Sequence, residues 1–366
     1  MSCTTVSRVS HESSAGAVDR ISVAVVGASG FTGALVAELL LRHPGVELVQ
    51  LSSEQLAGAP VAAHLPRLRT ELVFCAPAEV GGVDLALVCA PHGQAAHVVR
   101  RLLDGGARVV DLSADFRLDA ETYAAWYGPH PCPELLPGAV YGLTELHRPA
   151  IAGAALVANP GCYPTAALLA LTPLLSLGLT DVVIDAKSGV SGAGKAATPR
   201  THFCTVDCDF IAYALAGHRH YPEIVAGLAA ASAATSTAAG TSPADGAAGA
   251  ASPVPTVTFV PHLMPVQRGI VETLYVRTEH LPAAGELRRL LETAYAAEPF
   301  VDVCDQPPEL KDVVGTNRCR LFATLDERAA RIVVVAAIDN LMKGAAGQAV
   351  QNLNVMAGFA EDRGLS

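Results

Sequence analysis

The chain has 366 residues, of which 51% are hydrophobic and 16% are charged. This length allows two domains with cores of their own, and the composition is that of a globular chain. The formal net charge of -10 argues against a nucleic-acid-binding surface. No apolar run reaches the ~18 residues of a membrane span, and the polar, Ser-rich start lacks the apolar core of a secretory signal.

The nine cysteines are odd in number and scattered along the chain. They form neither a compact disulfide framework nor the paired CxxC pattern of a zinc site. Cys204 and Cys208 lie near His202 in sequence, but no second pair of ligands follows at zinc spacing. We therefore expect no metal site, reduced thiols and a cytoplasmic protein.

A glycine-rich turn, GASGFTG, stands between an expected strand at 21–26 and an expected helix at 34–42. It matches GxxGxxG, a pattern that has meaning when a strand precedes it and a helix follows. Gly27 permits the tight turn, Gly30 lets the backbone approach a pyrophosphate, and Gly33 lets helix and strand pack closely. The helix N-terminus then offers N–H donors to the phosphates.

The end of the next expected strand, at 46–51, indicates which dinucleotide binds. An NAD site usually has Asp or Glu here to hold the ribose 2′-OH. This chain has Ser52 and Ser53, whose small hydroxyls accommodate a 2′-phosphate, so we favour NADP(H). Glu54 follows directly, and NAD(H) stays open as the alternative.

Further strands at 84–89 and 108–112 continue an alternation of strands and helices from residue 21 to about 160. This alternation predicts a doubly wound parallel sheet of the Rossmann type. Loops at the carboxyl ends of such strands line the ligand crevice, so we expect Pro91 beside the cofactor. His92 is a candidate for the same contact, with an ordinary loop histidine as the alternative.

The stretch NPGCYPT at 159–165 places a cysteine on a Pro/Gly turn, before a helix that we expect to begin at Pro164. Backbone N–H groups and the positive end of the helix dipole would lower the pKa of the Cys162 thiol and favour the nucleophilic thiolate. A buried structural cysteine beside a turn is the alternative at this point.

Two later motifs carry polar groups suited to chemistry. The loop KSGVSGAGK at 187–195 offers a cradle for a substrate phosphate, with a flexible surface loop as the alternative. The motif GHRHYPEI at 217–224 supplies imidazoles, which move protons near neutral pH and pair with thiolates in catalysis. A structural histidine cluster is the alternative for this second motif.

The remaining elements predict a second region of α+β type. We expect strands at 181–186, 256–260, 270–277 and 331–338, a helix at 287–297, a loop at 261–269, a C-terminal helix from about 344, and a flexible Ala/Ser-rich insertion at about 232–252.

Eight motifs of the chain, taken in order, resemble those of the N-acetyl-γ-glutamyl-phosphate reductase family. They are VVGASGFTG, LSADFR, NPGCYPTA, DAKSGVSGAGK, GHRHYPEI, PHLMPVQRGI, VGTNRC and AIDNLMKGAAGQAVQN. This family belongs to the wider aspartate-semialdehyde dehydrogenase superfamily. The resemblance runs from about residue 20 to 362, and only the N-terminal extension and the insertion depart from it.

The resemblance implies an NADPH-dependent reduction of N-acetyl-L-glutamyl 5-phosphate to N-acetyl-L-glutamate 5-semialdehyde, with release of phosphate, in arginine biosynthesis. It also implies a homodimer or homotetramer. The expected parts are a disordered extension at 1–20, an NADP-binding domain at 21–163, a substrate and oligomerisation domain at 164–343, and a helix at 344–362 that packs back on the first domain.

By the same resemblance, Cys162 is the nucleophile that forms a thioester, and His220 is its acid/base partner, with His218 in reserve. The expected cofactor contacts are Gly27, Ser29, Gly30, Phe31, Thr32, Gly33, Ser52, Ser53, Pro91, Gly192 and Asn340. The expected substrate contacts are Arg117, Asn159, Ser188, Ser191, Lys195, His218 and Arg219.

Three alternatives stay open at the level of sequence. Aspartate-semialdehyde dehydrogenases carry out the same chemistry on a shorter substrate, although the HRHxPE and GTNRC motifs speak against that substrate. An α-aminoadipate derivative differs by one methylene, which a binding site discriminates weakly. A nicotinamide-binding regulator without catalysis is the alternative from a different class.

Overall fold

The computed structural model describes residues 20–238 and 254–365. The N-terminal extension expected at 1–20 therefore lies almost wholly outside the described residues. Within the described ranges, every helix is too short or too polar to cross a membrane.

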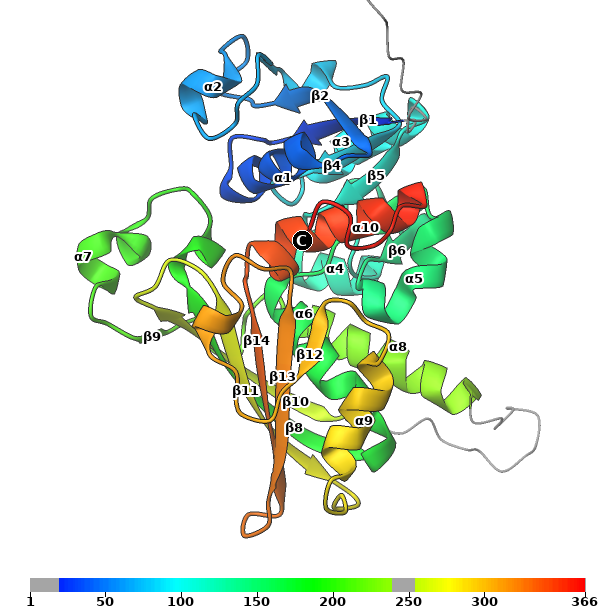
Figure 1. Cartoon of the computed structure of the whole chain (residues 1–366), viewed down its shortest axis with the longest axis vertical. Coiled ribbons are helices and arrows are strands. Elements are labelled where there is room, and N and C mark those ends of the chain that lie inside the picture. Colours follow the sequence, from blue (N-terminus) through cyan, green and yellow to red (C-terminus); the bar gives the residue numbers. More distant parts are fainter. Residues whose placement is uncertain (1–19, 239–253, 366) are drawn as a thin grey trace, which may run out of the picture.

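The first sheet is a seven-stranded parallel sheet with the order β3-β2-β1-β4-β5-β7-β6. Helix α3 covers one face, and helices α1 and α10 cover the other (Figure 1). The strands are β1 (Ile21–Val26), β2 (Val46–Ser52), β3 (Phe74–Cys75), β4 (Leu85–Val88), β5 (Arg108–Asp111), β6 (Ala139–Tyr141) and β7 (Leu156–Ala158). The helices are α1 (Phe31–Arg42), α2 (Val61–His64), α3 (Ala95–Asp104), α4 (Ala120–Tyr127), α5 (Thr144–Gly153) and α10 (Gly347–Ala357).

The strand order reverses between β1 and β4, which lie side by side although two strands and two helices separate them in sequence. In open α/β sheets, ligands bind at the carboxyl ends of the strands at this point of reversal. The glycine-rich turn follows β1 there, and Ala90-Pro91 follows β4. This confirms the Rossmann-type doubly wound sheet.

The second sheet is mixed and has the order β12-β13-β14-β11-β8-β10-β9. Helices α6, α8 and α9 pack against one of its faces (Figure 1). The strands are β8 (Leu179–Gly189), β9 (Ile211–Ala212), β10 (Thr256–Met264), β11 (Ile270–Thr278), β12 (Val301–Val303), β13 (Cys319–Asp326) and β14 (Arg331–Ile338). The helices are α6 (Cys162–Leu171), α7 (Phe203–Val206), α8 (Tyr221–Ala238) and α9 (Glu286–Tyr295).

Several sequence-based boundaries are wrong. Helix α6 begins at Cys162 rather than Pro164, because a proline is tolerated throughout the first turn, where N–H groups lack helical acceptors. Strand β8 continues to Gly189 and β10 to Met264, because the two pair in parallel from Asp181 and Thr256 up to these residues. The pairing covers the expected loop starts at 187 and 261. The insertion expected from 232 begins inside α8, and its remainder, 239–252, lies outside the described residues.

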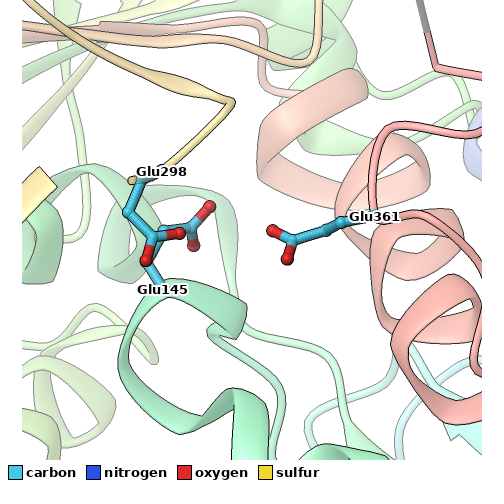
Figure 2. Close-up of side chains that lie close together, drawn as sticks. All are labelled: Glu145, Glu298 and Glu361. Atoms are coloured by element: carbon cyan, nitrogen blue, oxygen red, sulfur yellow. The ribbon is translucent and has the colours of Figure 1, made fainter. Parts of the chain in front are cut away.

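An ion-pair network fastens the two sheets together through Glu145, Glu298 and Glu361. Figure 2 shows these carboxylates turned toward one another from α5, from the segment after α9 and from the chain beyond α10. Their oxygens lie within 4.8 Å of one another, a spacing that also suits a metal ion. Basic and amide side chains, however, already bind all three carboxylates.

Two cations offset most of the negative charge of this cluster. The Arg148 guanidinium bonds Glu361 at 2.6 Å and also pairs with Glu298. Buried Lys343 donates to Glu145 at 2.5 Å. Because the carboxylates are engaged in this way, the cluster acts as a bridge between α5, the second sheet and the C-terminal segment.

Replacing Arg148 by Met should lower the melting temperature by several degrees. The change strands two largely buried carboxylates, 8% and 15% exposed, without their cation, at a cost of about 2 kcal/mol after allowance for the exposed part of the arginine. Differential scanning calorimetry measures the shift. Arg328→Met, at an arginine that is 94% exposed, is the matched control and should shift it little. Equal melting temperatures for the two variants would contradict the bridging role.

Candidate active site

A cavity of about 450 Å³ lies where the two sheets meet, and both contribute to its wall. The first sheet supplies the glycine-rich turn and the loop after β4, while the second region supplies the loop after β8 and residues from the C-terminal segment. Residues that line this cavity include Gly30, Phe31, Thr32, Gly33, Pro91, Arg117, Asn159, Gly161, Cys162, Ser191, Gly192, Lys195, His220, Asn340 and Gly344.

Cys162 is the first residue of α6, and its surroundings hold it tightly. Gly161 is the N-cap, and its carbonyl accepts hydrogen bonds from both the backbone N–H and the hydroxyl of Thr165, each at 2.9 Å. On the other side, Gly344 comes so close that a Cβ there would stand 2.7 Å from the Cβ of Cys162. A glycine is therefore required at 344.

Glu223 organises the turn before the cysteine, a role that the sequence did not reveal. Its carboxylate accepts hydrogen bonds from the Gly161 N–H at 2.7 Å and the Tyr141 hydroxyl at 2.8 Å. It also pairs with Arg117 at 3.2 Å, in a site where the glutamate is 3% exposed. Glu223 stands inside the GHRHYPEI motif, and an acid in the first turn of a helix was the one available signal.

His220 and Cys162 line the same cavity. The His220 Nε2 stands 2.8 Å from the position of a Cβ built on Gly161, the residue next to the cysteine. Its Nδ1 is buried, with no hydrogen-bond partner among the described residues. Burial, with His218 and Arg117 nearby, lowers the pKa of His220 well below its usual value. The imidazole is consequently neutral at pH 7, the form that accepts a proton, although the same burial makes it a weaker base than an exposed imidazole.

His218 does not line the cavity of about 450 Å³, but together with His220 and Cys162 it borders a second cavity. Its ring contacts those of His220 and Tyr163 edge-on, and its Nδ1 accepts a hydrogen bond from the His220 N–H at 3.1 Å. Burial, with Arg219 nearby, lowers the pKa of His218 to about 4. This ring therefore supports His220 as a neutral group and borders the second cavity together with Arg219 and Tyr213.

The thiol differs from the expectation of a lowered pKa. Burial raises the pKa of Cys162 to about 12, although the Tyr163 N–H and the Arg117 charge favour the thiolate. Desolvation of this partly exposed thiol outweighs the effect of the helix terminus. Without ligand the sulfur is thus a thiol that needs a base.

The glycine-rich turn fits a dinucleotide. Gly27 has a φ of +76°, and a Cβ on Gly33 would stand 2.3 Å from the Gly27 carbonyl, so neither position accepts another residue. A Cβ on Gly30 would meet nothing closer than 3.7 Å. Space is therefore free beside Gly30, where a phosphate group fits against the start of α1.

A neighbouring cavity of about 860 Å³ extends from this turn past the end of β2. Ser29 and Ser53 line it, and their hydroxyls are 2.9 Å apart. Ser52 is fully buried and accepts from the Gly27 N–H at 3.3 Å, so it supports the turn from behind instead of facing the cavity. Glu54 also lines this cavity, where the ribose of the cofactor belongs in this fold.

The residues expected to contact the substrate divide into those whose side chains are bonded within the protein and those that remain at a cavity wall. The side-chain amide of Asn159 accepts from Asn352 at 3.0 Å, and the Arg117 guanidinium donates to the carbonyls of Asn159 and Leu112, so both side chains already brace the site. Ser191 accepts from Asn340 at 3.0 Å and remains at the cavity wall.

The other expected contacts lie around this wall. Ser188 and Arg219 border the second cavity, where the Arg219 guanidinium lies over the Tyr127 ring and 2.9 Å from the His92 Nε2. Lys195 lies between the cavity of Cys162 and the cavity of Ser29.

Comparisons with known proteins give matches over most of the chain. Models of the semialdehyde dehydrogenase NAD-binding domain and dimerisation domain match residues 22–154 and 162–340. The N-acetyl-gamma-glutamyl-phosphate reductase of Dehalococcoides mccartyi strain CBDB1 is 44% identical over 346 residues, which cover 93% of this chain and 96% of that protein. The reductase of the same name from Desulforudis audaxviator strain MP104C is 46% identical over 357 residues, 94% of this chain and 98% of the relative.

A solved structure shares the fold. Aspartate semialdehyde dehydrogenase II from Vibrio cholerae has a TM-score of 0.70 at 20% identity, covering 93% of this chain and 99% of that one.

Alkylation of Cys162 by iodoacetamide should be slow at pH 7 and rise about tenfold per pH unit up to pH 9, because only the thiolate reacts and its fraction grows with pH far below the raised pKa. Peptide mass spectrometry follows the label, with exposed Cys204 and Cys208 as internal references. Fast labelling of Cys162 that is independent of pH would contradict a protonated thiol.

Proposed function

We propose that this chain, which belongs to the N-acetyl-gamma-glutamyl-phosphate reductase family, reduces N-acetyl-L-glutamyl 5-phosphate to N-acetyl-L-glutamate 5-semialdehyde and releases phosphate, as a step of arginine biosynthesis. The observation that carries the proposal is the shared cavity of Cys162, His220 and the glycine-rich turn. A nucleophile, a base and a dinucleotide site are the three parts that this chemistry needs.

Cys162 attacks the carbonyl carbon of the acyl phosphate. As its C–S bond forms, neutral His220 takes the thiol proton, and phosphate leaves with the electron pair of the broken C–O bond. The result is a thioester on Cys162. Reduced nicotinamide dinucleotide, when bound at the glycine-rich turn, would supply the hydride for this thioester. His220 then returns its proton to the sulfur as the C–S bond of the thiohemiacetal anion breaks and the aldehyde is released.

The start of α6 stabilises the negative charge that develops on the substrate oxygen. The backbone N–H groups of Cys162 and Tyr163 stand in the first helical turn, where no helical carbonyl accepts them. In comparable sites such a donor contributes about 3–4 kcal/mol to transition-state stabilisation. Glu223 fixes the direction of these groups by holding the Gly161 N–H.

We propose NADP(H) as the dinucleotide. The cavity beside Ser53 has hydroxyls that accommodate a 2′-phosphate, and Lys195 and His64 bring positive or ionisable groups to its wall. Glu54 is the opposing feature, since its carboxylate repels a phosphate and accepts hydrogen bonds from a ribose diol.

We further propose a homodimer or homotetramer in the cytoplasm, with 21–163 and 344–362 as the dinucleotide-binding domain and 164–343 as the substrate and oligomerisation domain. Support for pairing comes from the face of the second sheet opposite α6. Apolar side chains there are only half-buried in the single chain, as burial alternates along β11 and β14. Examples are Val271, Tyr275, Val333 and Val335.

The reverse reaction tests the activity. With inorganic phosphate and NADP⁺, N-acetyl-L-glutamate 5-semialdehyde should give NADPH, whose absorbance is followed, and aspartate semialdehyde should react far more slowly. Cys162→Ser should abolish the reaction but retain NADPH binding, as measured by fluorescence titration. The reason is that the cysteine attacks the substrate and does not hold the phosphates of the dinucleotide. Turnover by this variant, or a preference for aspartate semialdehyde, would contradict the proposal.

Replacing Glu54 by Gln should tighten NADPH binding about fivefold, because it removes a carboxylate from the ribose end of the cavity. Binding of NADH should stay equal or weaken. Fluorescence titration of both dinucleotides measures the two Kd values. Glu47→Gln, at an exposed position on β2 that borders neither cavity, is the control. Weaker NADPH binding in Glu54→Gln would show that Glu54 does not oppose the 2′-phosphate.

A further inference from the structure

The loop after β8 reaches from the second sheet to the glycine-rich turn of the first. Its Lys195 donates a hydrogen bond from Nζ to the carbonyl oxygen of Ser29 at 3.0 Å, across 166 positions of sequence. The start of the loop is anchored elsewhere, because the N–H groups of Val190 and Ser191 donate to the carbonyls of Val266 and Gln267. Lys195 is thus the far end of a loop fixed at its base.

The ammonium of Lys195 has bonding capacity to spare. An ammonium group carries three N–H donors, and the Ser29 carbonyl uses one. The buried or half-buried Lys187 and Lys343 form ion pairs with Asp185 and Glu145. In the part of the chain that the structure describes, no carboxylate stands within ion-pair distance of Lys195, which is exposed and borders both cavities.

The location of Lys195 points to the dinucleotide. Ser29 is the third residue of the GASGFTG turn, the part of this fold that holds a pyrophosphate. A cation bonded to a carbonyl of that turn adds positive charge where the phosphates bind. By contrast, Ser191 and Gly192 face the cavity of Cys162 from the same loop.

We propose that Lys195 is a ligand of the dinucleotide pyrophosphate, contributed by the substrate region, and not a ligand of the substrate phosphate as its sequence motif indicated. This inference rests on the proposed reductase function and adds a coupling to it. Binding of the dinucleotide holds the far end of the loop, and thereby orders Gly192 and Gly194 beside Cys162, where the substrate phosphate binds.

The coupling has a thermodynamic consequence. If dinucleotide binding orders the loop for phosphate, then phosphate tightens dinucleotide binding by the same factor. Removing the Lys195 charge weakens NADPH binding and breaks this mutual effect. A lysine that served only the substrate phosphate would leave NADPH binding in the absence of phosphate untouched.

The test is fluorescence titration of the full-length protein with NADPH, with and without inorganic phosphate as the probe of the substrate site. Lys195→Met should raise the Kd for NADPH about tenfold without phosphate and make it insensitive to phosphate, while the wild type binds more tightly when phosphate is present. Lys195→Arg should restore most of the affinity. Lys311→Met, remote from both cavities, is the control and should bind like the wild type.

Two results for Lys195→Met would contradict the inference. A Kd for NADPH in Lys195→Met within twofold of the wild type would overturn the inference, and a raised KM for phosphate in that same variant would return Lys195 to the substrate. Because the side chain is exposed, an unchanged melting temperature verifies that the variant is folded. Wild-type protein that bound neither NADPH nor NADH would contradict the proposed function itself, and this inference with it.

Discussion

The carboxylate of Glu223 is the constraint on which the site depends. It binds the Gly161 N–H, the Tyr141 hydroxyl and the Arg117 guanidinium, and so ties α8 of the second region to two loops and the end of β6 in the first sheet. A buried carboxylate without these donors would cost several kcal/mol. The charge therefore requires the turn before Cys162 to adopt one position, and that position points the start of α6 into the cavity.

A second constraint acts on the cysteine from the C-terminal segment. The single turn of π-helix at Met342–Ala346 places Gly344 against Cys162 and Lys343 against Glu145. Glu145, which pairs with Lys343, belongs to the carboxylate cluster of Figure 2, so this cluster fixes the same segment that closes the back of the site. Packing at this point desolvates the partly exposed thiol and raises its pKa, so the thiol stays protonated until a base takes its proton.

Local patterns predicted much of this arrangement. The spacing of glycines after β1 was sufficient for the dinucleotide turn, and the NPGC and HRH motifs identified two residues that share one cavity. Contacts between residues far apart in the chain could not be predicted from local sequence patterns. Glu223 meets its three partners across 62, 82 and 106 positions, and Lys195 meets Ser29 across 166. The direction of the Cys162 pKa shift was missed for the same reason, because desolvation depends on packing that no local motif records.

The most direct test of covalent catalysis is intact-protein mass spectrometry after mixing the protein with N-acetyl-L-glutamyl 5-phosphate in the absence of reduced dinucleotide. Thioester chemistry predicts one added N-acetylglutamyl group, located by peptide mapping on Cys162 and released by hydroxylamine. Addition of NADPH should remove the group as the semialdehyde. The absence of any adduct under turnover-competent conditions, or an adduct on a residue other than Cys162, would contradict the mechanism.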